Sequence, residues 1–355
     1  MWVESPDLDR CPPFHPLRGI RTMCPFHDLR TMRTLCTQDG HTSRGTRTPG
    51  PTRGTMADVP EPTVRWNRYV ALGDSFTEGL WDSPDGDAGP ATPDVPLRGW
   101  ADVLAARLSE RRVAAGEDPL EYANLAIRGR LLRPILADQV PAAIGLRPDL
   151  VSLVGGGNDI LRPAADVDRL ARQLETAVVR LRAAGIDVLL GTGVDTVHSG
   201  LIRATRPRVA TYNAHIWSIA RRHGAHVVDL WGMRSLLDWR MWADDRIHLT
   251  TEGHARVAQA ALVGLGLAPD DERWDDPLAP QPPAPRLEQL RGDARWAREH
   301  VYPWATRRLR GRSSGDTRRP KRPVPEPVVT QDAADAGAQD AGTPDVGAQD
   351  AGRRD

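Results

Sequence analysis

The feature that most constrains the fold is the stretch YVALGDSFTEG at residues 69–79. A short apolar run rich in strand-forming residues stops at Gly73, and Gly79 lets the chain turn again. This pattern predicts a buried strand that ends at an exposed serine, Ser75. In open α/β sheets, ligands bind at the carboxyl ends of the strands. Since Gly-Asp-Ser also occurs in ordinary turns, the rest of the chain must decide between a site and a plain turn.

Strand-like and helix-like segments alternate after this stretch. Apolar runs typical of buried strands lie at residues 122–125, 150–154, 186–190 and 227–230, and helical periodicity lies at about residues 97–115, 164–184 and 207–223. Parallel strands need crossovers of about a dozen residues or more, which helices of this length supply. The sequence therefore predicts an α/β fold, a three-layer α/β/α doubly wound sandwich with a mostly parallel sheet of about five strands. The Asp-, Gly- and Pro-rich loop at residues 81–96 is expected to be irregular and exposed.

Three further motifs follow Gly-Asp-Ser in order. Residues 124–129 (NLAIRG) and 156–159 (GGND) each come after a strand-like run, and residues 245–248 (DRIH) precede a helical pattern. With these four blocks the chain resembles the SGNH hydrolases, also called the GDSL esterase/lipase family, over about residues 66–268. Four matched blocks in one order are far more specific than any one of them. The resemblance implies the same three-layer, flavodoxin-like fold.

Three residues carry the expected chemistry: Ser75, Asp245 and His248. A serine hydroxyl is a poor nucleophile at neutral pH unless a base removes its proton. Asp245 lies three residues before His248, so one short loop can bring the carboxylate to the imidazole Nδ1–H and leave Nε2 facing the serine. We therefore expect Ser75 as the nucleophile, His248 as the general acid and base, and Asp245 as the residue that orients the imidazole. Without the other motifs, Asp245 and His248 would be read as an ordinary surface pair.

An ester carbonyl under attack becomes an oxyanion that needs hydrogen-bond donors placed in advance. The backbone N–H of Ser75 is one natural donor. The resemblance implies two more, the backbone N–H of Gly129 and the side-chain amide of Asn158. Asp74 is expected to bind loop amides or cap a helix, and His254 to be a packing or capping residue of the last helix.

These expectations describe a metal-independent serine hydrolase that cleaves carboxylic esters of small molecules through an acyl-serine intermediate, with no cofactor. The resemblance leaves the substrate open, because related proteins act on lipids, acetylated sugars, thioesters and small esters. We expect specificity to lie in residues 81–96 and 192–206, and a small substrate with a short acyl group, since no aromatic-rich surface loop is evident. Three alternatives remain: acyl transfer to an alcohol, O-deacetylation of a carbohydrate, and a catalytically silent ligand-binding protein.

The chain is expected to divide into four parts. Residues 64–268 form the hydrolase domain. Residues 1–63 lack strand or helix periodicity and are expected to be a disordered extension, with Met56 as a candidate start of translation. Residues 269–314 combine a Pro- and Asp-rich linker with a basic helical segment. Residues 315–355 contain the hexapeptide GAQDAG twice and are expected to be a disordered low-complexity tail.

Composition narrows the partners and the compartment. The 47 basic and 47 acidic residues balance, so no overall field favours nucleic acid or an anionic membrane. We expect no nucleic-acid partner, although the Arg-rich run at residues 307–312 could contact phosphate. No apolar stretch reaches the length of a membrane span, and no secretory signal is visible, so a cytoplasmic protein is expected. Cys11, Cys24 and Cys36 all precede the predicted domain and fit neither a disulfide framework nor a zinc pattern.

Overall fold

A computed structural model describes residues 63–84, 86–88, 95–282, 285–303, 306 and 315–329 of the chain. The three cysteines, the candidate start at Met56, the run at residues 307–312 and the repeated hexapeptide lie outside these residues. Within the described part, no helix is both long and apolar enough to cross a membrane.

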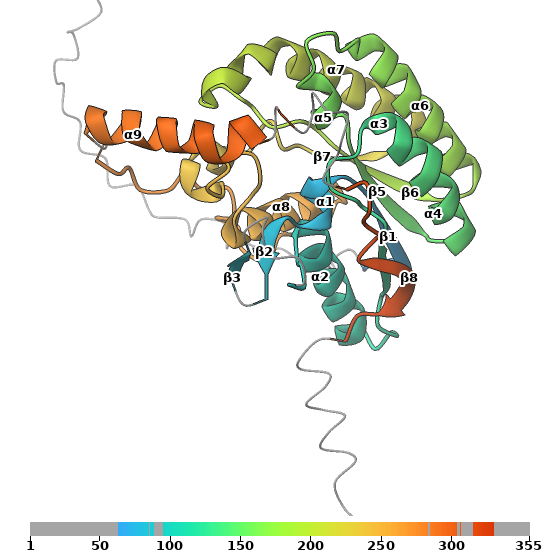
Figure 1. The fold of residues 1–355 in the computed structure, drawn as a ribbon. Helices are drawn as coiled ribbons and strands as arrows, with labels where there is room; N and C mark the ends of the chain where they lie inside the picture. The colour runs from blue at the N-terminus through green and yellow to red at the C-terminus, as the bar shows by residue number, and fades with distance from the viewer. Residues whose placement is uncertain are drawn as a thin grey trace, which may run out of the picture. The chain divides into compact units, whose positions relative to one another are not determined.

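A six-stranded sheet forms the centre of the fold, with the strand order β7-β6-β5-β1-β4-β8 (Figure 1). Five strands run parallel: β1 (Arg68–Gly73), β4 (Glu121–Asn124), β5 (Leu150–Val154), β6 (Asp187–Gly191) and β7 (His226–Val228). The sixth, β8 (Arg322–Pro327), pairs antiparallel with β4 at one edge. The mostly parallel doubly wound sheet predicted from the sequence is confirmed, and β8 is the strand that the prediction lacked.

The central strand β1 is buried on both faces, which is why its sequence is a continuous apolar run. Tyr69 and Ala71 point into one hydrophobic cluster, and Val70 and Leu72 point into the other. This alternation is the period of two that a strand imposes on its side chains. Tyr69 also stacks on Tyr122 of the neighbouring strand, with ring centroids 5.2 Å apart.

Helices cover both faces of the sheet (Figure 1). One face packs against α2 (Trp100–Ala114) and α8 (Thr251–Gly264), and the other against α4 (Val140–Leu146), α6 (Val167–Ala183) and α7 (Arg206–His223). The remaining elements are α1 (Ser75–Glu78), β2 (Trp81–Ser83), β3 (Gly86–Ala88), α3 (Leu132–Pro134), η1 (Ile135–Gln139), α5 (Gly157–Ile160), η2 (Gly200–Thr205), η3 (Ser235–Leu237), η4 (Trp239–Met241), α9 (Arg286–Trp296) and η5 (Ala297–Val301). The layers match the three-layer α/β/α prediction.

Residues 315–329 correct the expectation that the chain is disordered from residue 315 onward. Their strand β8 contains three prolines at alternate positions, Pro323, Pro325 and Pro327. A proline cannot donate to a ladder, but on an edge strand every second N–H points away from the sheet. The backbone N–H groups of the even-numbered residues point towards β4. Val328, for example, donates its N–H to the carbonyl of Leu120 at 2.8 Å. The expectation of a low-complexity tail rested on the repeated hexapeptide GAQDAG, which lies beyond residue 329.

Residues 81–88 also differ from the irregular, exposed loop that was expected. Strands β2 and β3 form a small antiparallel hairpin, and Trp81, Asp82 and Ser83 are buried. The Asp82 carboxylate accepts a hydrogen bond from the Thr251 hydroxyl at 2.7 Å. Asp82 thus packs inward here because Thr251 at the start of α8 donates to its carboxylate.

Candidate active site

The predicted nucleophile, Ser75, is the first residue of helix α1, directly beyond the carboxyl end of the central strand. Asp74 caps this helix by accepting a hydrogen bond from the Phe76 N–H at 3.1 Å, as expected from the sequence. A glycine is required at Gly73, because a Cβ there would lie 2.6 Å from the carbonyl oxygen of Val154. The strand can therefore end close to its neighbour and turn sharply at the serine.

Gln139 holds Gly73 at two points. Its side-chain oxygen accepts from the Gly73 N–H at 2.8 Å, and its amide donates to the Gly73 carbonyl at 2.9 Å. The glutamine is buried, so this pair of bonds is shielded from water. Sequence reasoning missed Gln139, because it lies in the π-helical turn η1 and belongs to none of the four motifs.

His248 brings the three expected residues together. Its Nε2 lies 2.8 Å from Ser75 Oγ, and its Nδ1 lies 2.5 Å from Asp245 Oδ2. The loop that carries it is closed by a hydrogen bond from the Ala243 N–H to the His248 carbonyl at 2.9 Å. Helix α8 begins three residues later, after the cap residue Thr250. The three side chains therefore form one continuous hydrogen-bonded chain from carboxylate to hydroxyl.

Four donors satisfy the buried Asp245 carboxylate. The backbone N–H groups of Ile247 and His248 both donate to Oδ1 at 3.0 Å, while His248 Nδ1 and the indole Nε1–H of Trp81, at 2.8 Å, reach Oδ2. Burial alone would raise the pKa of Asp245, but the charge and hydrogen bonds of His248, with the N–H of Ile247, outweigh it and lower the pKa to about 2. The carboxylate is thus held ionised beside the imidazole.

Trp81 is a second residue that sequence reasoning missed. The structure places it in strand β2 with a positive φ of 75° and a buried ring. A buried indole N–H needs a hydrogen-bond partner, and here that partner is the Asp245 carboxylate. The only sequence signal is the position of a tryptophan two residues after Gly79, inside a loop that otherwise reads as polar.

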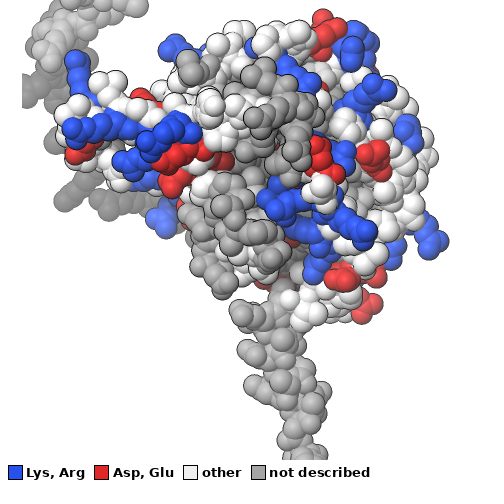
Figure 2. Space-filling view, viewed as in Figure 1, with Lys and Arg blue, Asp and Glu red and all other residues white. Residues whose placement is uncertain are grey.

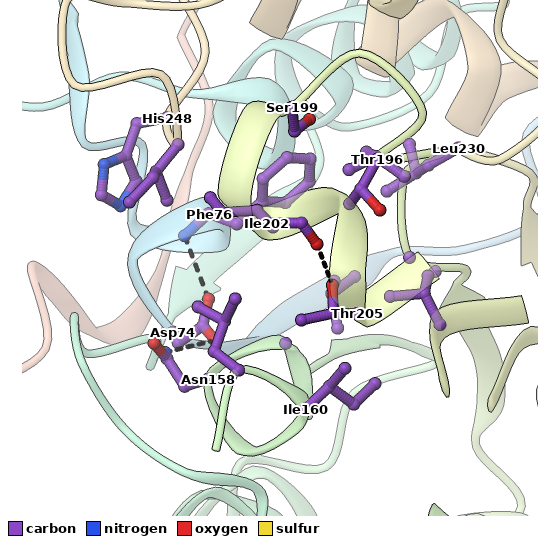
Figure 3. Close-up of a pocket in the computed structure, with 18 of the residues that line it drawn as sticks. Asp74, Phe76, Asn158, Ile160, Thr196, Ser199, Ile202, Thr205, Leu230 and His248 are labelled. Carbon is purple, nitrogen blue, oxygen red and sulfur yellow. Dashed lines mark hydrogen bonds between the residues drawn. The ribbon is translucent and has the colours of Figure 1, made fainter. Parts of the chain in front are cut away.

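Asn158 lies at the start of α5 and lines the same cavity as Ser75. Its amide nitrogen donates to Asp74 Oδ2 at 3.0 Å (Figure 3). It also donates to the Arg130 carbonyl at 3.1 Å. Burial raises the pKa of Asp74 to about 6, against the lowering effects of the Phe76 N–H, the charge of His248 and the Asn158 amide. The amide is therefore oriented by the residue that immediately precedes the serine.

Gly129, the other expected donor, follows β4 in a turn with a positive φ of 72°. The residue before it, Arg128, is tied to α1 by a buried ion pair with Glu78. The Glu78 carboxylate also accepts the backbone N–H of Arg128 at 2.6 Å. The loop that carries Gly129 is thus fixed to the helix that carries Ser75.

His254, which the sequence suggested as a packing or capping residue, is fully enclosed behind the site. Its Nδ1 accepts a hydrogen bond from the Trp100 N–H at 3.2 Å. Burial lowers its pKa to about 4, so the ring stays neutral near physiological pH. It therefore joins α8 to the start of α2 and is not part of the chain that reaches Ser75.

A cavity of about 190 Å³ opens beside Ser75 and His248 (Figure 3). Much of its wall is apolar and comes from Phe76, Ile160, Leu161, Val194, Ile202 and Leu230. Residues 192–206, which were expected to determine specificity, supply one side of it. A space of this kind suits a hydrocarbon chain attached to the reacting carbonyl.

A second, wider space of about 1200 Å³ adjoins this cavity, and Ser199, Ile202, Trp242 and Arg246 line both. Its other wall is formed by α9 and η5. Side chains of both charges lie along α9 (Figure 2), and the aromatic rings of Trp239, Trp242 and Trp296 border the groove, which we call the α9 groove. Polar and aromatic surfaces thus meet on the open side of the site. No cluster of His, Cys, Asp and Glu suited to a metal occurs among the residues that the structure describes.

Comparisons with known proteins identify the family. The model of the GDSL-like lipase/acylhydrolase family matches residues 71–256, and no curated protein matches the chain. Similar solved structures include an acetylxylan esterase from Geobacillus stearothermophilus, with 19% identity, 58% of this chain and 97% of that chain covered, and a TM-score of 0.47. An α/β hydrolase from the metagenome of Lake Arreo, Spain, has 26% identity, coverage of 56% and 95%, and a TM-score of 0.47.

A third solved structure, TesA, has 22% identity, coverage of 56% of this chain and 97% of its own, and a TM-score of 0.43. The family match covers Ser75 at the start of α1, the GGND turn and the loop of His248, which are the parts that form the candidate site. The chain therefore belongs to the GDSL-like lipase/acylhydrolase family, as its sequence motifs predicted.

Proposed function

We propose that this ester-hydrolysing enzyme works through an acyl-serine intermediate, with Ser75 as the nucleophile, His248 as the general acid and base, and Asp245 as the orienting carboxylate. The single observation that carries the proposal is the unbroken chain of hydrogen bonds from Asp245 through His248 to Ser75 Oγ. In such a chain the imidazole Nε2 accepts the serine proton as Oγ attacks the ester carbonyl. The ionised carboxylate then stabilises the imidazolium that forms.

The steps follow from this geometry. Attack by Ser75 Oγ forms a tetrahedral oxyanion, and the imidazolium returns its proton to the departing alcohol, which leaves an acyl-serine. Water then enters, gives its proton to His248 and attacks the acyl carbonyl, and the acid is released as the serine regains its proton. The proton shuttle needs no group beyond those already in contact.

We assign the oxyanion to the backbone N–H groups of Ser75 and Gly129 and to the Asn158 amide. The amide already donates to Asp74 and to the Arg130 carbonyl. A substrate oxyanion would therefore share an N–H that Asp74 has oriented, and the carboxyl of Asp74 would act as the positioning group of that donor. A donor fixed before the reaction costs no reorganisation when charge develops.

We assign the apolar cavity to the acyl group and the α9 groove to the alcohol. The cavity of about 190 Å³ beside Ser75 is lined largely by apolar side chains and has room for more than an acetyl group. This favours short to medium acyl chains, a wider range than the short acyl group expected from the sequence. The α9 groove, which carries charged and aromatic side chains, suits a polar alcohol and supports the carbohydrate O-deacetylase alternative as the second candidate.

Hydrolysis of p-nitrophenyl esters from acetate to long acyl chains, by wild type and by Ser75→Ala, tests this function. We expect activity that peaks at short to medium chains and disappears with the serine hydroxyl. Activity that survives in Ser75→Ala would remove the serine from the mechanism. An added alcohol or sugar acceptor separates hydrolysis from acyl transfer, and binding without turnover in wild type would support the silent ligand-binding alternative. A cytoplasmic location remains a prediction from the sequence.

A further inference from the structure

Helix α9 and the turn η5 lie beyond residue 256, where the family match ends. Neither element contains a buried residue. The apolar side chains Leu287 and Leu290, which a packed helix would bury, are 59% and 67% exposed. Packing of an apolar face therefore does not explain where α9 lies. Its position must be explained by its polar contacts.

The first of these contacts reaches Asp245, the proposed orienting carboxylate. The indole Nε1–H of Trp296, at the end of α9, donates to the backbone carbonyl of Asp245 at 2.8 Å. Trp81 donates to the side chain of the same residue at the same distance. Asp245 is thus held by two indoles, one on its carboxylate from within the family domain and one on its backbone from α9.

The second contact involves Arg246, the next residue. Arg246 has a left-handed backbone with φ of 59°, a conformation that a side chain with a Cβ disfavours. Its guanidinium lies 5.0 Å from the ring centroid of Trp296 and 5.8 Å from that of Trp239, and it pairs with Asp293 of α9 at 2.7 Å. These contacts hold the side chain of the residue whose backbone turns the chain between Asp245 and His248.

A third contact comes from η5. The ring of His300 lies 6.3 Å from the ring of Trp81, measured between centroids. Trp81 is the indole that donates to the Asp245 carboxylate. The α9–η5 segment therefore touches Asp245, the residue that follows it and one of its four hydrogen-bond donors.

We propose that Trp296 is a positioning residue of the active site, through which the α9–η5 segment fixes Asp245 in the orientation that His248 requires. The proposal rests on the roles proposed above for Asp245 and His248. Trp296 touches neither substrate carbonyl nor serine in this scheme, and it acts by holding the backbone of the orienting acid. The segment would then complete the catalytic site from outside the family domain.

The variant Trp296→Phe tests this proposal, because it keeps an aromatic ring beside Arg246 and removes the indole N–H donor. Trp217→Phe is the matched control, since Trp217 is 48% exposed on α7 and lies outside the site. We expect Trp296→Phe to lower kcat by about ten- to a hundredfold, the effect of a small misplacement of a catalytic group, with KM little changed. The control should match wild type in both constants.

Proton NMR provides a readout that does not depend on turnover. The Nδ1–H of His248, in a short bond to Asp245, should give a resolved downfield resonance in wild type and in Trp217→Phe. In Trp296→Phe that resonance should move upfield or broaden as exchange with water increases. Thermal unfolding of each variant confirms that the fold is retained.

Two results would overturn the proposal. An unchanged resonance with unchanged kcat would show that the Asp245 carbonyl needs no donor from α9. An unchanged resonance with a raised KM that depends on the alcohol would make Trp296 a wall of the α9 groove instead. If wild type cleaves no ester, the proposed function fails, and the resonance still decides whether Trp296 positions Asp245.

Discussion

Glu78 and Arg128 form a buried ion pair that joins the helix of Ser75 to the loop of Gly129. Arg128 Nη2 lies 2.7 Å from Glu78 Oε1, and its Nε lies 3.0 Å from both carboxylate oxygens. Both side chains are only 7% exposed. A buried pair of this kind gives little net stability over apolar residues, but removing one partner leaves an uncompensated charge. Because the pair joins the helix of Ser75 to the loop of Gly129, we expect it to keep these two oxyanion donors in position.

Glu78→Ala should therefore destabilise the fold strongly. Leaving Arg128 buried without its carboxylate typically costs about 3–5 kcal/mol, and the Arg128 N–H loses its acceptor as well. Urea unfolding at neutral pH measures the free energy of unfolding. The double variant Glu78→Gln/Arg128→Met, which restores an acceptor and removes the charge, should recover most of the loss. If the single variant were as stable as wild type, the pair would not be a buried, coupled unit.

The free energy of unfolding depends on pH through Asp245. Its pKa falls from an ordinary 3.8 to about 2 on folding, so the ionised carboxylate stabilises the folded state above the unfolded pKa. That contribution, about 2 kcal/mol for a shift of this size, is lost as the pH falls from about 4 to about 2. We expect the gap in unfolding free energy between wild type and Asp245→Asn to be widest near neutral pH and to narrow by about that amount over this acid range. A gap that stays constant with pH would contradict the lowered pKa.

Asn158→Ala tests the side-chain donor of the oxyanion hole. Loss of one such donor typically costs about 2.7–4 kcal/mol of transition-state stabilisation, or a hundred- to thousandfold in kcat. Because Asn158 is only partly buried, the variant should unfold at nearly the same temperature as wild type. Steady-state kinetics with one p-nitrophenyl ester would show the loss in kcat. Near-normal turnover in a folded variant would remove Asn158 from the hole.

Val194→Phe tests the assignment of the apolar cavity to the acyl chain. A larger side chain at Val194, which lines the cavity, should exclude longer acyl groups and leave acetate nearly unaffected. The expected change is at least about tenfold in the octanoate-to-acetate ratio of kcat/KM, the scale of hydrophobic pocket effects. Val179→Phe, at a position 45% exposed on α6, is the control for the substitution itself. Equal losses for both esters would mean that the chain does not enter this cavity.

The central sheet and the Asp245–His248 contact could be predicted from the sequence because both depend on local patterns, whereas the contact of His248 with Ser75, 173 positions away, was expected only from the four motifs together. Continuous apolar runs indicate doubly buried strands, and the spacing of three residues brings Asp245 and His248 onto one loop. Gly129 and Asn158 came from the family resemblance alone. Their roles as oxyanion donors remain predictions. In the structure the Asn158 amide donates hydrogen bonds to the Asp74 carboxylate and to the Arg130 carbonyl.

The residues that sequence reasoning missed share a different property. Gln139 reaches Gly73 across 66 positions of the chain, and Trp81 reaches Asp245 across 164. Such contacts depend on which distant segments meet in the fold. The local periodicity of the sequence does not show this. Strand β8 was missed for a related reason, because its pairing with β4 joins residues about 200 positions apart. The helical segment expected at residues 269–314 is present as α9, but its contacts with Asp245 and Arg246 could not be read from the sequence.

The most direct test of the account is to trap the acyl-enzyme. Wild type is mixed with a p-nitrophenyl ester and quenched in acid within the first turnovers, and the adduct is located by peptide mass spectrometry. We predict a mass increase equal to the acyl group on the peptide that contains Ser75, and no such adduct in Ser75→Ala. Ester cleavage without any covalent adduct, or an adduct on another residue that persists in Ser75→Ala, would contradict the proposed mechanism.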